Sequence, residues 1–82
     1  MHCFHDQQIL EMLLTYLLEQ LMEQTAFKTD KTKYFMALQV ISVGAEEYRY
    51  NFLLECSNYL ISMEIANELL NQLLGFTPRL GN

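Results

Sequence analysis

The stretch Ile9–Met22, "ILEMLLTYLLEQLM", decides the fold class of this chain. Leucine, methionine and tyrosine fill most of its positions, and it contains neither glycine nor proline. Its apolar residues recur at the three- and four-residue spacing of a helix, and Glu11, Glu19 and Gln20 interrupt the run. We therefore expect a helix that starts after Asp6, whose carboxylate would cap it, and that ends near residue 24.

The apolar side of this first helix is wider than one core contact requires. Its apolar side chains cover about 200° of the helix circumference, whereas a stripe of about 100° is enough to face a core. These side chains are Ile9, Leu10, Leu13, Leu14, Tyr16, Leu17, Leu18 and Leu21. The surplus predicts a protein interface on this helix. Its candidate residues are Leu10, Leu14, Leu18, Leu21 and Met22.

Size and composition also favour a protein with a partner. The 82 residues are enough for one domain with a thin core, and 51% of them are hydrophobic while only 18% are charged. The formal net charge of −5 would repel a nucleic-acid backbone and an anionic membrane. No apolar run reaches the ~20 residues of a membrane span, and two distant cysteines without a signal-like start predict a cytoplasmic location.

The polar segment 25–33, "TAFKTDKTK", predicts a loop in which Thr29 or Asp30 caps the next helix. From residue 31 to residue 43 the apolar side chains point in every direction of a helical wheel, which indicates a central helix buried on all sides. A buried strand at 40–43, "VISV", is the alternative, but it would have no sheet partner. The predicted interface also includes Tyr34, Phe35 and Met36.

Gly44 is expected to begin a third helix, because acidic residues follow it and favour a helix start. That helix would end near Ile61, and one continuous helix over 31–61 is an open alternative. A last helix is predicted to follow Ser62 as its N-cap and to end at Gly75 in a left-handed conformation. Its predicted buried side consists of Ile65, Ala66, Leu69, Leu70 and Leu73.

Arg49 is unusual because it falls within the apolar side of the third helix, between two tyrosines. A lone guanidinium is costly in a core, so its stem is expected to pack while its head reaches water or pairs with Glu46. The alternative is an interface anchor, since arginine and tyrosine often dominate the binding energy of interfaces. Tyr48, Arg49 and Tyr50 therefore complete the predicted protein interface.

The first six residues, "MHCFHD", come closest to reactive chemistry. His2, Cys3 and His5 are candidate ligands for a zinc or copper ion, but a closed tetrahedral site needs a fourth ligand. We therefore interpret residues 1–5 as a loose leader and residues 77–82 as a loose tail. Cys56 lies on the apolar side of the third helix and is expected to be a small buried hydrophobe rather than a reactive thiol.

No sequence motif predicts catalysis. The chain has no glycine-rich phosphate loop, nucleophile elbow or HExxH pair, so we expect no enzyme, no cofactor and no small-molecule substrate. The last helix has no lysine or arginine with which it could read DNA in a helix-turn-helix. Direct nucleic-acid binding is therefore not expected.

These patterns predict an all-α fold, a small antiparallel bundle or hairpin array of three to four helices that forms one domain over residues 1–82. The predicted function is a non-catalytic protein-interaction module, which acts as a small regulator, adaptor or chaperone-like partner. It would associate with itself or with a partner through a helical surface. The alternatives are a metal- or thiol-responsive sensor based on His2, Cys3 and His5 and, more weakly, a subunit of a DNA-associated regulator.

Overall fold

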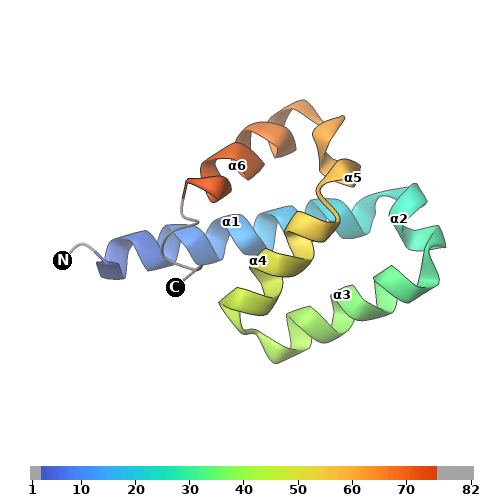
Figure 1. The fold of residues 1–82 in the computed structure, drawn as a ribbon, viewed down its shortest axis with the longest axis horizontal. Coiled ribbons are helices and arrows are strands. Elements are labelled where there is room, and N and C mark those ends of the chain that lie inside the picture. The colour runs from blue at the N-terminus through green and yellow to red at the C-terminus, as the bar shows by residue number, and fades with distance from the viewer. Residues whose placement is uncertain (1–2, 76–82) are drawn as a thin grey trace.

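A computed structural model describes the backbone of residues 3–75, with side-chain positions from residue 7 onward (Figure 1). Over this range the chain forms six helices and no strand, which confirms the all-α prediction. They are α1 (Cys3–Glu23), α2 (Thr25–Thr29), α3 (Lys31–Val43), α4 (Glu46–Glu55), α5 (Asn58–Ile61) and α6 (Glu64–Leu74). The predicted count of three to four helices is not confirmed, because the short helices α2 and α5 were not expected.

The central helix is α1, not the second long helix as the sequence predicted. All the other helices pack against α1, and in Figure 1 α6 lies on one side of it and α3 on the other. The start of α1 also differs from the prediction, because its first helical residue is Cys3. Asp6 therefore lies inside the helix, and residues 3–5 continue it rather than form a loose leader. Residues 1–2 and the predicted tail at 77–82 lie outside the described residues.

The hydrophobic core forms where α1 meets α4, α5 and α6. Its fully covered leucines include Leu14, Leu17, Leu21, Leu53, Leu60 and Leu73. Because α1 has helices on several sides, its wide apolar arc is largely used within a single chain. Burial of each such leucine contributes about 1.5–3 kcal/mol, and α1 supplies six of the ten buried leucines among the described residues.

Phe27 lies in α2, a short helix within the segment that was predicted to be a loop. Its side chain is fully buried, and its ring centroid lies 5.4 Å from that of Tyr59, 6.2 Å from that of Phe52 and 6.3 Å from that of Tyr34. This packing stabilises α2, although the segment is too polar to indicate a helix by itself. Asp30 then caps α3 as predicted, because its carboxylate accepts a hydrogen bond from the backbone N–H of Lys33 at 3.3 Å.

Two breaks divide the segment from α3 to α5. Gly44 ends α3 with a φ of 78°, a left-handed conformation that costs glycine no strain, and its N–H donates to the carbonyl of Val40. Gly44 is therefore a C-cap rather than the predicted helix start, and Ala45 precedes α4. A second break follows Glu55. The continuous helix over 31–61 is thus excluded.

The helix α3 has the predicted bounds, but its burial was predicted wrongly. Ala37 is its one buried residue, while Tyr34 and Val40 are partly covered. The reason is its position, since α3 packs on α2 and α4 and only lightly on α1 (Figure 1). Apolar residues around the whole circumference of α3 therefore did not indicate that other helices surround it.

The helix α6 buries most of the side that the sequence indicated. Ala66, Leu70 and Leu73 are buried and Leu69 is partly covered, but Ile65 is 64% exposed. Met63, not Ser62, precedes the helix, and it has no side-chain capping hydrogen bond. Gly75 has a right-handed φ of −67° instead of the predicted left-handed conformation. The amphipathic pattern thus predicted the core contact better than the helix ends.

Candidate interaction surfaces

Five residues of the predicted interface belong to the core instead. Leu10, Leu14, Leu18, Leu21 and Tyr50 are at most 5% exposed. The four leucines lie on the central helix α1, where neighbouring helices of the same chain cover them. A substitution such as Leu18→Glu would therefore place a charge in the core and unfold the domain, rather than separate two folded copies. Met22 and Tyr34 are half-buried against the same core.

The predicted residues Phe35 and Met36 do lie on the surface. Phe35 is 67% exposed and Met36 is 43% exposed, and Leu38 and Val43 extend the same apolar surface along the helix. We call these four residues the outer face of α3. The polar residues between them, Thr32, Gln39 and Ser42, are uncharged and also exposed. This surface has no covering element in the part of the chain that the structure describes.

The other two predicted residues, Tyr48 and Arg49, lie on α4. Tyr48 is 57% exposed, whereas Arg49 is half-buried and its Nη2 donates to the carbonyl of Ile41 at 3.4 Å. A positive charge at the C-terminal end of α3 is favourable, because it meets the negative end of the helix dipole. Its Nε is buried without a hydrogen-bond partner. Arg49 therefore joins α4 to the end of α3, a role that its sequence position did not indicate.

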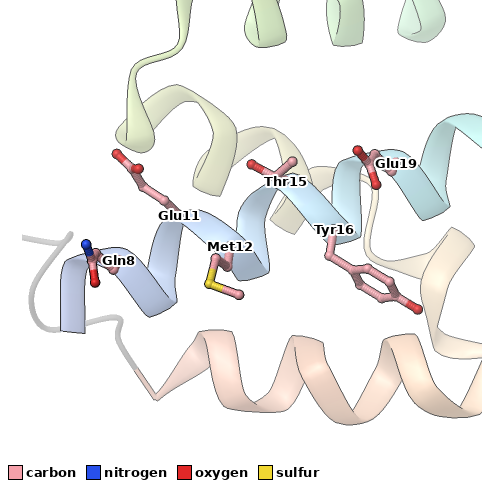
Figure 2. Close-up of a pocket in the computed structure, with 6 residues that line it drawn as sticks. All are labelled: Gln8, Glu11, Met12, Thr15, Tyr16 and Glu19. Carbon is pink, nitrogen blue, oxygen red and sulfur yellow. The ribbon is translucent and has the colours of Figure 1, made fainter. Parts of the chain in front are cut away.

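A shallow, open hollow on the exposed side of α1 was missed by the sequence analysis. It has a volume of about 620 Å³ and is lined by Gln8, Glu11, Met12, Thr15, Tyr16 and Glu19 (Figure 2). We call it the α1 groove. In Figure 2, Met12 and Tyr16 point toward α6, while Glu11, Thr15 and Glu19 point toward the opposite side. Met12 is 71% exposed.

Two smaller hollows continue the α1 groove toward α6. One, of about 270 Å³, is lined by Ile9, Met12, Leu13, Tyr16 and Leu69. The other, of about 300 Å³, is lined by Tyr16, Gln20, Met63, Glu64, Ile65 and Ala66. Tyr16 lines all three spaces, so they form one continuous surface between α1 and α6. The hydrophobic periodicity of the sequence did not indicate this surface, because its residues are divided between two helices.

The charges around α1 are mainly acidic. Burial raises the pKa of Glu46, at the start of α4, above its ordinary value of 4.5. The nearby Glu11 raises this pKa further by repulsion and by a side-chain hydrogen bond, while Arg49 lowers it. The contact between α1 and α4 thus brings the carboxyl groups of Glu11 and Glu46 together.

Cys56 is a free thiol and is only 1% exposed, as the sequence predicted. Burial raises the pKa of this thiol above its ordinary value, although Lys33 lowers it by a smaller amount. Both the poor access and the raised pKa reduce the amount of reactive thiolate. This environment opposes a thiol-sensing role for Cys56.

We expect Cys56 to react with an aromatic disulfide reagent at least about a hundredfold more slowly in the folded protein than in urea, because reaction requires opening of the core. The measurement uses a Cys3→Ser variant, so that Cys56 is the sole thiol. Equal rates for folded and unfolded protein would contradict the burial described here.

Two features of the described residues concern metal ligands and membrane-spanning helices. No three His, Cys, Asp or Glu side chains with described positions come together to hold a metal ion. The side chains of His2, Cys3 and His5 lie outside the described part, so the metal-sensor alternative stays a prediction. No helix over residues 3–75 is both long and apolar enough to cross a membrane.

Comparison with known proteins identifies no relative. No family model matches the chain, and neither a characterised protein nor a solved structure shows significant similarity to it. The inference of function therefore rests on the two surfaces described above.

Proposed function

We propose that this protein is a non-catalytic helical interaction module that forms a symmetric dimer through the outer face of α3. The observation that carries the proposal is the exposure of Phe35, at 67%, and of Val43, at 61%, on a helix with one buried residue. Such a dimer could act as a small regulator or adaptor. The predicted interface on α1 is replaced by this one, because the leucines of α1 are in the core.

The exposed area suits a second copy of the chain. An aromatic side chain offers about 150–250 Å², and Phe35 together with the three smaller aliphatic side chains of the outer face, at 42–67% exposure, presents a few hundred Å² of apolar surface. A stable interface of standard size buries about 800 Å² on each partner, and somewhat more than half of that is apolar. The outer face of α3 supplies most of this apolar part, with the neutral residues between supplying polar contacts.

Charge complementarity favours an antiparallel arrangement of the two copies. Asp30 is the sole acidic residue between Thr25 and Ala45, so this region lacks the negative charge of the rest of the chain. Around a twofold axis, the basic end of α3 in one copy, with Lys31, would face the acidic start of α4 in the other, with Glu47. The dipoles of the two α3 helices would also oppose each other favourably.

A charge exchange between these ends tests the proposal. We expect Lys31→Glu alone and Glu47→Lys alone each to weaken the dimer about tenfold, because each places like charges opposite one another at both ends of the interface. The double variant should restore dimerisation to within about twofold to threefold of the wild type. The dissociation constant is measured by sedimentation equilibrium at low ionic strength, where such pairs are strongest.

The double variant is also the control for general effects of charge, because its net charge equals that of the wild type. Two single variants without effect, or a double variant that is weaker than both, would rule out the antiparallel arrangement.

A further inference from the structure

We propose that the α1 groove binds a basic amphipathic helix of a partner protein. This inference rests on the proposed function as an interaction module, but it concerns a surface that shares no residue with the outer face of α3. The module would therefore associate with itself through one surface and hold a partner in the other.

The dimensions of the groove fit a short helix. Its lining extends along α1 from Gln8 to Gln20, which is about 18 Å at 1.5 Å per residue. This length corresponds to about twelve residues of a partner helix, or slightly more than three turns. Leu69 of α6 lines the adjoining hollow on the side of α1 toward which Met12 and Tyr16 point (Figure 2).

Apolar side chains at the floor and side of the groove supply the contact surface. Met12 is 71% exposed, Ile65 is 64% exposed and Tyr16 is 37% exposed. Together with Ile9 and Leu69 they line the continuous surface between α1 and α6. Methionine adapts its shape to different partners, and tyrosine adds an apolar ring with a polar end. A partner helix would place leucine-like residues here at i, i+3, i+4 and i+7.

The charges that border the groove select a basic partner. Glu11, Glu19 and Glu64 line it, and none of its lining residues is a lysine or an arginine. Arg49 lines an adjoining hollow that shares Thr15 and Glu19 with the groove, and its guanidinium there donates to the carbonyl of Ile41. Lysines and arginines that flank the apolar stripe of the partner helix would therefore meet carboxylates on the rim.

A second copy of this chain is a poor occupant of the groove, because the proposed dimer already buries the outer face of α3, its one long helix with a basic end. The chain carries a formal net charge of −5, and its lysines are confined to residues 28–33 at α2 and the start of α3. The other long helices α4 and α6 each carry acidic residues on their exposed sides. They would bring like charges against Glu11 and Glu19, which disfavours self-association at this site.

Peptide binding to the full-length protein tests the inference directly. The probe is a fluorescein-labelled amphipathic peptide of about 14 residues, with leucines at i, i+3, i+4 and i+7 and lysines on the flanking positions. The matched peptide has glutamates in place of the lysines. We expect saturable binding of the lysine peptide by fluorescence anisotropy, and at least about tenfold weaker binding of the glutamate peptide.

Variants of the protein distinguish this site from general attraction of charge. Glu19→Lys in the groove and Glu55→Lys on α4 change the net charge equally, and both residues are exposed. We expect Glu19→Lys to weaken binding about tenfold and Glu55→Lys to weaken it less than about threefold. Met12→Lys should also weaken binding at least about tenfold, because it adds a positive charge beside the apolar contact.

The outcomes separate this inference from the proposed dimer. Phe35→Glu is expected to disrupt dimerisation and to leave peptide binding within about twofold of the wild type. Equal effects of Glu19→Lys and Glu55→Lys, or equal binding of the two peptides, would overturn the groove proposal and leave the dimer untouched. Loss of dimerisation in Met12→Lys would show that a second copy occupies the groove, which would overturn both proposals.

Discussion

Replacement of Phe27 by alanine is expected to lower the free energy of unfolding by about 3–5 kcal/mol. Phe27 has no exposed surface, and three aromatic rings from α3, α4 and α5 surround it. The truncation would leave a cavity at the corner where α2 connects α1 to α3. For a domain of this size, the midpoint of thermal unfolding should fall by about 15–30 °C.

Urea denaturation followed by circular dichroism measures the loss. The control is Tyr48→Ala, which removes an aromatic ring that is 57% exposed and should change the free energy of unfolding by less than about 1 kcal/mol. Similar losses for the two variants would mean that the aromatic cluster around Phe27 does not hold the corner.

The second large effect is expected from Phe35→Glu, which should raise the dissociation constant of the dimer at least about a hundredfold, or about 2.7 kcal/mol. The twofold symmetry of the proposed dimer places one such charge from each copy in the desolvated apolar interface. Phe35 is exposed in the monomer, so the helical content should stay unchanged. Sedimentation equilibrium gives the dissociation constant, and circular dichroism gives the helical content.

Met12→Glu is the matched control for this variant. It introduces the same charge at an apolar residue of similar exposure, but on α1 rather than on α3. The proposed dimer should tolerate it without a measurable change in the dissociation constant. If Met12→Glu disrupts the dimer and Phe35→Glu does not, the interface lies in the α1 groove instead.

Local signals in the sequence were sufficient for part of the fold. Asp30 caps α3 as predicted, because a cap depends on a side chain and a backbone N–H three residues later. The buried side of α6 was largely predicted, because its apolar and polar residues are cleanly separated around the helix. Cys56 is buried as its position on the apolar side of the third helix indicated.

Features that depend on distant contacts were not predictable in this way. Phe27 lies in a polar segment, and α2 becomes helical through packing against α3, α4 and α5. The wide apolar arc of α1 indicated extra contacts, but a pattern does not distinguish contacts within the chain from contacts with a partner. For α3 the apolar pattern predicted burial within the chain. Most of its apolar residues are instead exposed, because α3 lies at the edge of the fold.

Sedimentation equilibrium of the wild-type protein alone, from low to high micromolar concentration, tests the proposed self-association most directly. We predict a mass that rises toward twice the 9.7 kDa of the chain, with a single monomer–dimer equilibrium that Phe35→Glu removes. A wild-type mass that stays at that of the monomer up to high micromolar concentration, without aggregation, would contradict the proposed dimer.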